Sequence, residues 1–232
     1  MNIVIPLVKS DNECEDLKYS LRSIEKNLIV DYSIIIIGYK PEWIKNVKHI
    51  PFVDGGDRYG NVLNKIIIAS LLYDEFVLFH DDMFIIKPLE IDELKTVYKL
   101  QDFKYIKKWG NKPFQKMLRI VYNMLIDKKL STINYTTHTP FFYESNKVFR
   151  VIEYFNLQCK KFVSFETLYY NYIGMQKAKN VKKVKFGKYD NSVFNKEDVI
   201  GKTFLSCDEF GKKSGIFEYI KDVFKTKSKY EK

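Results

Sequence analysis

Uninterrupted apolar runs recur along the first part of the chain, separated by segments in which apolar residues return at helical spacing. The runs at residues 2–8 ("NIVIPLV") and 32–38 ("YSIIIIG") are rich in Ile and Val, and weaker runs lie near residues 47–53 and 75–79. Short runs of β-branched residues bounded by polar ones are typical of buried strands. We therefore predict four strands in this part of the chain.

Two helices are predicted between these strands. Apolar residues at positions 17, 21, 24 and 28 fall on one face of a helix, and Asp11-Asn12 can cap its start. Residues 61–73 predict a second helix, which follows the glycine-containing turn "DGGDRYGN". Strands that alternate with helices form a mostly parallel sheet covered by helices. The expected fold class is therefore α/β and Rossmann-like.

Acidic residues follow three of the predicted strands. Asp11 comes after the first strand, Asp54 and Asp57 after the third, and Asp81-Asp82 after the fourth. In open α/β sheets, ligands bind beyond the carboxyl ends of the strands. These acids therefore predict the mouth of a binding site.

The pair Asp81-Asp82 stands between two apolar runs, residues 77–79 and 84–86. Desolvating a carboxylate is costly unless it has a partner, so either a turn exposes the pair or a cation binds it. Adjacent acids after a strand also occur as a plain turn or helix cap. A hard cation such as Mg²⁺ or Mn²⁺ binds one or two carboxylates together with phosphate oxygens of a substrate, which suits this pair.

The absence of two common nucleotide-binding motifs narrows the possible classes of reaction. The chain has no GxxxxGK[ST] loop and no GxGxxG loop, so neither a P-loop NTPase nor a dinucleotide oxidoreductase is supported. A metal that bridges a diphosphate neutralises the charge that develops on this leaving group. The remaining interpretation is transfer from a nucleotide-linked donor.

Composition indicates one globular unit in a reducing compartment. A chain of 232 residues that is 46% hydrophobic can bury a sizeable core. Its three cysteines, Cys14, Cys159 and Cys207, are an odd number without CxxC spacing, which disfavours disulfide frameworks and zinc sites. No apolar run approaches the ~18 residues that span a bilayer, and the N-terminal run is too short for a signal peptide. We expect a cytoplasmic protein, with peripheral membrane contact left open.

The net charge of +10 is concentrated in two segments. Residues 101–134 carry eight Lys or Arg against two acids, and residues 211–232 carry seven against three. We predict a single catalytic domain over residues 1–210 with a basic helical insertion at 101–134, followed by a basic C-terminal helix or tail at 211–232.

These basic segments have two interpretations. They could bind an anionic partner such as DNA, an acidic glycan or phospholipid head groups, or they could be solvated faces that keep the protein soluble. Trp109 and Phe114 stand among the lysines of the first segment. This interleaving keeps open a nucleic-acid-binding module without catalysis, although that function leaves the acidic strand ends unexplained.

Several segments resemble, in order, a known group of enzymes. They are "YSLRSIEKN", "SIIIIGYKPEWIKNVKHIPFVD", "GNVLNKIIIAS", "FVLFHDDMFIIKPL" and "THTPFFYESNKVF". The resemblance spans roughly residues 1–175 and is to phage and bacterial GT-A-like glycosyltransferases related to the Stealth sugar-phosphotransferases. It implies a GT-A-like fold, a nucleotide-sugar donor and Mn²⁺ or Mg²⁺. It also allows for a phage-encoded enzyme that acts in the host cytoplasm.

The chain departs from the related pattern at two places. His80 stands where the related acidic motif begins with Asn, and the N-terminal Stealth block is missing. The resemblance therefore favours metal-dependent transfer of a sugar to a glycan or nucleic-acid acceptor. Stealth-type transfer of a sugar phosphate remains the alternative.

The resemblance implies roles for individual residues. Asp82 would bind the metal, Asp81 would contact the donor ribose or sugar, and His138 in "THTP" would act as general base or contact the diphosphate. The segment "DGGDRYGN" and the helix after it have two interpretations of their own: Arg58 and Lys65 would pair with the donor phosphates or with the two acids, or the segment is only a turn that its glycines permit before the helix. The full set of expected donor-binding residues is Pro6, Lys9, Asp11, Tyr39, Asp54, Asp57, Arg58, Lys65, His80, Lys147 and Asp208.

Overall fold

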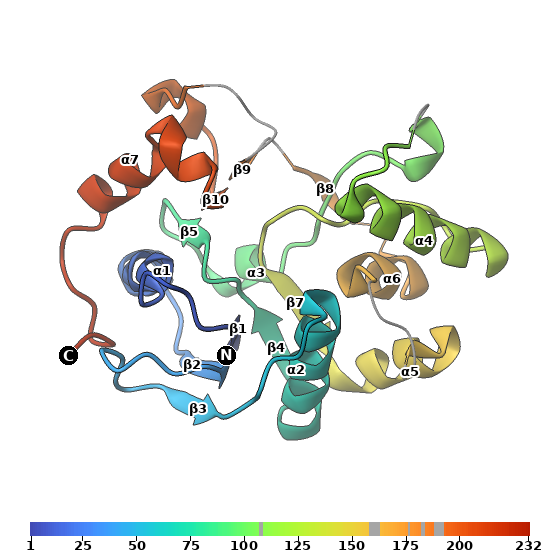
Figure 1. Ribbon diagram of the computed structural model, residues 1–232, viewed down its shortest axis with the longest axis horizontal. Helices are drawn as coiled ribbons and strands as arrows, with labels where there is room; N and C mark the ends of the chain where they lie inside the picture. Colours follow the sequence, from blue (N-terminus) through green and yellow to red (C-terminus); the bar gives the residue numbers. More distant parts are fainter. Residues whose placement is uncertain (107–108, 158–162, 176, 182–183, 188–192) are drawn as a thin grey trace.

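A five-stranded sheet forms the centre of the protein (Figure 1). The computed structural model describes residues 1–106, 109–157, 163–175, 177–181, 184–187 and 193–232. The strands lie in the order β3-β2-β1-β4-β7, and four of them are parallel while β7 runs antiparallel to β4. They are β1 (Asn2–Leu7), β2 (Ser33–Gly38), β3 (Lys48–Ile50), β4 (Glu75–Leu78) and β7 (Phe141–Glu144). The predicted mostly parallel α/β sheet is thus confirmed.

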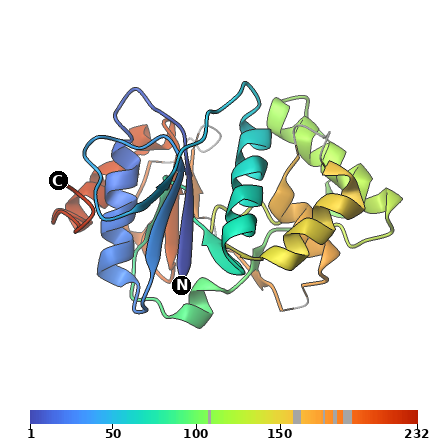
Figure 2. The ribbon, with the colours of Figure 1, turned by 90° about the horizontal axis from the view of Figure 1, so that it is seen from below.

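The Ile- and Val-rich strands are buried because helices cover both faces of the sheet. Helix α1 (Glu15–Asn27) lies on one face and α2 (Arg58–Leu72) on the other (Figure 2). The chain runs from β1 outward to β2 and β3, and then returns through α2 to place β4 on the opposite side of β1. The strand order therefore reverses between β1 and β4, which is where open α/β sheets bind ligands.

The starts of both helices differ from the predictions. Asp11-Asn12 does not cap α1, which begins at Glu15 after Cys14 in a left-handed conformation. The Ser10 hydroxyl instead accepts from the Cys14 backbone N–H, because residues 10–14 form tight turns. Helix α2 begins three residues earlier than predicted, since the Asp57 side chain accepts from the Tyr59 N–H and caps it.

A second, smaller sheet packs beside the end of β4. Strand β5 (Met83–Ile85) pairs antiparallel with β10 (Phe204–Cys207), which pairs parallel with β9 (Lys185–Phe186). Phe84, Phe186 and Leu205 of this sheet form a separate cluster with α7 (Ile216–Val223), while Met83, Ile85 and Phe204 belong to the main core. This sheet brings the residues just before β5 next to those that follow β10.

The remaining elements extend beyond α2 and along the strand ends. In Figure 2, α4, α5 and α6 lie on the far side of α2 from the sheet. The full set of remaining elements is α3 (Ile91–Leu94), β6 (Tyr98–Lys99), η1 (Phe103–Tyr105), α4 (Pro113–Asp127), α5 (Ser145–Phe155), α6 (Phe165–Tyr172), β8 (Lys179–Asn180), η3 (Lys196–Val199) and η4 (Gly211–Ser214).

The two basic segments both contain helices. In the described part of residues 101–134, α4 buries Met117, Val121 and Leu125, while its Lys116 and Arg119 face solvent. The last residues of the chain return to α1, where Glu231 pairs with Arg22 at 2.6 Å. Among the described residues, no helix has the length and apolar character needed to cross a membrane.

Candidate functional site

Two adjoining cavities lie at the carboxyl ends of the parallel strands. One, the β1–β3 cavity, has a volume of about 560 Å³ and lies beyond the ends of β1, β2 and β3. The other, the switch-point cavity, has a volume of about 410 Å³ and lies beyond β1 and β4, where the strand order reverses. Val8 and Asp54 line both cavities. The two cavities therefore meet at these two residues.

The β1–β3 cavity combines an aromatic side chain with cations. Tyr39 and Lys40 follow β2, and Lys9 follows β1, with its ammonium 5.7 Å from the centre of the Tyr39 ring. His49 on β3 shares a hydrogen bond of 2.9 Å with the Gly38 carbonyl. Aromatic rings and lysines of this kind can stack on a base and bind phosphate. Three sequence-predicted residues, Lys9, Tyr39 and Asp54, meet here.

A buried lysine fixes the boundary between the cavities. Lys65 on α2 donates to the Leu7 carbonyl at 2.9 Å and pairs with Asp54 at 2.7 Å. The prediction that Lys65 binds donor phosphates or Asp81-Asp82 is not supported, because this ammonium already has Asp54 and Leu7 as partners. Gly38 is required beside it, since an added Cβ would lie 2.0 Å from the Leu7 carbonyl oxygen.

The neighbouring acids Asp81 and Asp82 face different parts of the site. Asp81 lines the switch-point cavity. Burial, followed by the negative charges of Asp82 and Asp16, raises the pKa of Asp81 to about 7. Its carboxyl group can therefore donate or accept a hydrogen bond near neutral pH.

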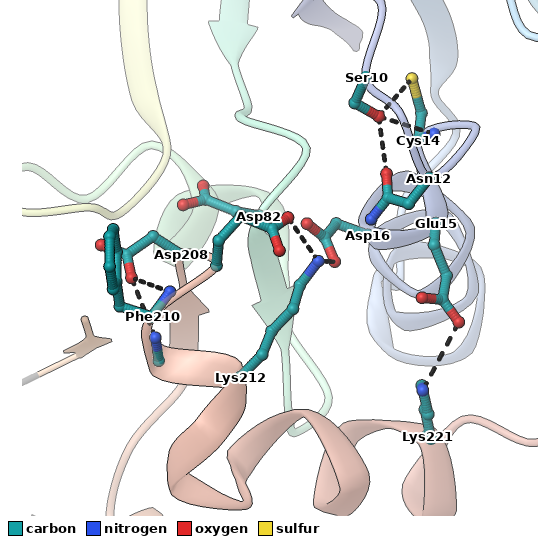
Figure 3. Close-up of polar contacts among 12 residues, drawn as sticks. Ser10, Asn12, Cys14, Glu15, Asp16, Asp82, Asp208, Phe210, Lys212 and Lys221 are labelled. Atoms are coloured by element: carbon teal, nitrogen blue, oxygen red, sulfur yellow. Dashed lines mark hydrogen bonds and ion pairs between the residues drawn. The ribbon is translucent and has the colours of Figure 1, made fainter. Parts of the chain in front are cut away.

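Asp82 faces the second sheet, where Asp208 lies near it (Figure 3). The Ser206 hydroxyl donates to Asp82 Oδ2 at 3.2 Å. The Lys185 ammonium lies 3.7 Å from Asp82 Oδ2 and 3.8 Å from Asp208 Oδ2, so it bridges the two carboxylates. The backbone N–H groups of Phe210 and Gly211 both donate to Asp208 Oδ1 at 3.0 Å and fix that side chain.

A second ion pair connects the segment after β10 to α1. Lys212 on η4 lies 2.8 Å from Asp16 Oδ1 on α1 and 2.7 Å from Glu209 (Figure 3). Burial raises the pKa of Asp16 to about 6, although Lys212 opposes this shift. Asp16 and Lys212 thus join the first helix to the C-terminal segment beside the candidate site.

The donor set around Asp82 fits a hard divalent cation that completes its coordination with substrate and water. In the described part of the chain, no three His, Cys, Asp or Glu side chains are arranged to hold a metal. Mg²⁺ and Mn²⁺ sites that act on phosphates commonly use only one or two carboxylates. The Lys185 ammonium, which lies between Asp82 and Asp208, is a positive charge where such an ion would bind.

Two histidines line the switch-point cavity. His80 follows β4, and burial lowers its pKa. His138 has a left-handed backbone with φ 53°, and the hydroxyls of Thr137 and Thr139 on either side share a hydrogen bond of 2.8 Å. Burial, followed by the charge of Lys185, lowers the pKa of His138 to about 3. Both imidazoles are therefore neutral at pH 7 and can each donate one hydrogen bond and accept one.

The switch-point cavity also contains residues that the sequence-based prediction omitted. Glu166, in the first turn of α6, lines its wall and accepts from the Ser164 hydroxyl at 2.6 Å. Phe114 and Met117 of α4 form another part of the wall. Glu166 belongs to a helix whose other residues are mostly buried, so the sequence pattern of this helix is typical of core.

Not every predicted residue joins the cavities. Pro6, Arg58, His80 and His138 line the switch-point cavity. Asp11 is exposed in the loop after β1, and Asp57 caps α2. Lys147 pairs with Glu144 and lines a separate hollow with Arg150 and Tyr169, so it lies away from both cavities.

Cys159 lies outside the described residues, and the described cysteines Cys14 and Cys207 are buried free thiols.

The sheet, its switch point and the loops at the strand ends define a GT-A-like α/β fold. Among solved structures, a crystal structure of an active-site mutant of LgtC aligns with 99% of this chain and 98% of its own, with TM-score 0.55 and 11% identity. LgtC is a GT-A glycosyltransferase. Comparison of the sequence with protein-family models and with curated proteins gives no match. The likeness to LgtC shows the shared fold.

Proposed function

We propose that this protein is a glycosyltransferase that uses a nucleotide-sugar donor. The observation that carries the proposal is the pair of adjoining cavities at the reversal of strand order, with Asp81 on the wall of the switch-point cavity and Asp82 next to it in the chain. The GT-A-like fold supports the same conclusion at the level of fold. Because a fold alone does not define chemistry, the reaction depends on the residues of the site.

The two cavities suit the two halves of such a donor. The nucleoside would occupy the β1–β3 cavity, with its base against Tyr39 and its phosphates near Lys9 and Lys40. The sugar would occupy the switch-point cavity, whose wall carries Asp81, Glu166 and neutral histidines. Closely placed acids and imidazoles recognise sugar hydroxyls, because each hydroxyl both donates and accepts a hydrogen bond.

Mn²⁺ or Mg²⁺ would be held by Asp82 and Asp208. When bound, this ion would supply positive charge that stabilises the departing nucleoside diphosphate. Arg58, the first residue of α2, lines the switch-point cavity. The N-terminus of this helix adds backbone N–H groups that favour anions. Together these groups would neutralise the diphosphate between the two cavities.

His138 would contact the donor or the acceptor hydroxyl as a neutral imidazole. A histidine with a pKa of about 3 is a weak base, so a hydrogen-bonding contact suits it better than general base catalysis. Asp81, with a pKa of about 7, is the stronger candidate for exchanging a proton near neutral pH. Glu166 would orient a sugar hydroxyl from the opposite wall.

The acceptor would approach past α4. Phe114 and Met117 place the N-terminal part of this helix at the wall of the switch-point cavity, and Lys112, Lys116 and Arg119 are exposed on it. This combination favours an anionic acceptor such as DNA or an acidic glycan. A nucleic-acid-binding module without catalysis would use the same basic helix and leave both cavities unexplained.

A ligand screen tests the proposal. Purified protein is heated with UDP-, GDP- and CDP-sugars, with and without Mn²⁺, because a ligand that binds only the native state raises its unfolding temperature. We expect one nucleotide class to stabilise the protein, and more so with Mn²⁺. No stabilisation by any donor would contradict the proposal.

A mass measurement of the product then distinguishes sugar transfer from Stealth-type transfer of a sugar phosphate. An acceptor that gains only the sugar residue supports a glycosyltransferase. An acceptor that gains the sugar together with one phosphate supports the alternative.

A further inference from the structure

Lys185 is placed between the two carboxylates that the proposed function assigns to a divalent cation. Its ammonium lies 3.7 Å from Asp82 Oδ2 and 3.8 Å from Asp208 Oδ2, and its side chain is 28% exposed. Both distances are too long for a tight hydrogen bond and within the range of an ion pair. The ammonium is thus shared by two acids and held tightly by neither.

Three strands of the second sheet fix this arrangement. Asp82 immediately precedes β5, Asp208 follows β10, and the antiparallel pairing of these strands brings the two acids together. Lys185 is on β9 and pairs in register with Ser206 of β10, whose hydroxyl donates to Asp82. The acids and the lysine therefore share one small, continuous sheet.

The ammonium group of Lys212, which lies nearby, has other partners. Lys212 lies 2.8 Å from Asp16 and 2.7 Å from Glu209, so its charge is used by those two acids. Among the ion pairs of the described residues, those of Asp82 and Asp208 are both with Lys185. Two carboxylates therefore share one ammonium and retain a net negative charge, which attracts a further cation.

We propose that Lys185 is a displaceable internal counter-ion of the Asp82–Asp208 pair. In the metal-free protein it offsets part of the negative charge of the two acids and keeps them close together. A divalent cation must move the ammonium aside before it can contact both carboxylates, so Lys185 weakens binding of the cation alone. A donor diphosphate offers the displaced ammonium a new anionic partner, which links cation binding to donor binding.

This inference rests on the proposed function, because it takes Asp82 and Asp208 as the cation ligands. Mn²⁺ binding is measured without donor, from the electron paramagnetic resonance signal of free Mn²⁺, in the wild type and in variants. Lys185→Met should tighten Mn²⁺ binding by about tenfold, since it removes a partly exposed like charge from between the two carboxylates that would hold the ion. Lys185→Arg, which keeps the charge, should bind Mn²⁺ like the wild type.

Two further variants serve as controls. Lys179→Met removes one exposed lysine from β8 and makes the same change in net charge, so it should leave Mn²⁺ affinity unchanged. Asp82→Asn, alone and combined with Lys185→Met, should abolish the tight binding. Lys185→Gln, which can still donate to both acids, replaces Lys185→Met if the latter does not fold.

The outcomes separate the two proposals. Equal Mn²⁺ affinity in Lys185→Met and wild type, with loss in Asp82→Asn, would overturn the inference and leave the cation site in place. Equal affinity in Asp82→Asn and wild type would overturn the cation site itself. As an independent measurement, Mn²⁺ should raise the unfolding temperature of Lys185→Met more than that of the wild type, and an equal rise would also overturn the inference.

Discussion

Lys65 Nζ lies 2.7 Å from Asp54 Oδ1, and this buried ion pair joins the middle of α2 to the loop that separates the two cavities. The same ammonium donates to the Leu7 carbonyl at the end of β1. Lys65 is 3% exposed and Asp54 is 16% exposed at their side chains. The pair therefore stabilises the fold and also holds Asp54 at the point where both cavities meet.

Replacing Lys65 by Met should destabilise the protein by about 3 kcal/mol, because it leaves the Asp54 carboxylate and the Leu7 carbonyl without their buried donor. Urea unfolding at pH 7 measures the loss. Lys87→Met, at an exposed position, is the matched control and should change the free energy of unfolding by less than about 0.5 kcal/mol. Similar unfolding midpoints for the two variants would contradict the structural role of Lys65.

The pH dependence of stability should report on Asp16. Its pKa is about 6 in the folded protein, above the value of an unfolded chain near 4. The folded state therefore binds this proton more tightly, and the corresponding stability is present below pH 4 and is lost as pH rises through 6. As pH rises from 4.5 to 8, the free energy of unfolding of Asp16→Asn should therefore increase by about 2 kcal/mol relative to that of the wild type.

Urea unfolding at these two pH values measures the difference. Asp31→Asn, at an exposed position before β2, serves as control and should follow the wild type at both pH values. If Asp16→Asn loses stability relative to the wild type as pH rises, the carboxylate is stabilised by Lys212 more than it is destabilised by burial.

Four of the five strands of the main sheet, all except β7, could be predicted from the sequence because these strands carry their signal locally. The Ile-rich runs at residues 2–8 and 32–38 form β1 and β2, and the weaker run at 75–79 forms β4. The sheet of β5, β10 and β9 could not be predicted in this way. Its strands have two to four residues, and the pairing of β5 with β10 joins segments that are more than a hundred residues apart.

The candidate site also contains some residues that the sequence predicts and others that it does not. Asp81, Asp82 and Asp54 could be found because acids that follow a strand meet at one edge of a parallel sheet. Lys185 stands in a lysine-rich segment, where no local pattern distinguishes it from solvent-exposed lysines. Its role depends on the register of β9 with β10, which only the folded structure provides.

Asp208 should matter as much as Asp82 for metal-dependent donor binding. Each variant, Asp82→Asn and Asp208→Asn, should remove the part of the thermal stabilisation by a nucleotide sugar that requires Mn²⁺, because an amide cannot supply the charge a hard cation needs. Asp11→Asn is the matched control, since Asp11 is exposed outside both cavities and should have no effect. Loss of binding in Asp11→Asn alone would place the donor along the β1–α1 loop instead.

His138 allows stability and function to be tested separately. Its backbone is left-handed, a conformation that Asn tolerates well and β-branched residues do not. His138→Asn should therefore fold with unchanged or higher stability, while turnover falls by ~10²-fold if the imidazole contacts substrate. His138→Val should lose about 2 kcal/mol of stability. Full activity in the Asn variant would remove His138 from the site.

The exposed basic face of α4 provides the test of the acceptor. Reversing the charge of Lys112, Lys116 and Arg119 to Glu should leave donor binding unchanged, because these side chains are exposed and do not line the cavities assigned to the donor. Binding of duplex DNA or of an acidic polysaccharide should be lost. In the wild type this binding should weaken steeply with salt, since contacts to dense anions release roughly one counterion for each charge neutralised.

The same change of charge in the C-terminal segment is the matched control for that experiment. Lys225, Lys227 and Lys229 are exposed near the end of the chain, on the side of α1 rather than beside α4. If both triple variants lose binding equally, the anion responds only to net charge and α4 is a solvated face. If only the α4 variant loses binding, the acceptor passes along α4. Preference for DNA over glycan in that case would direct the search for products to modified bases.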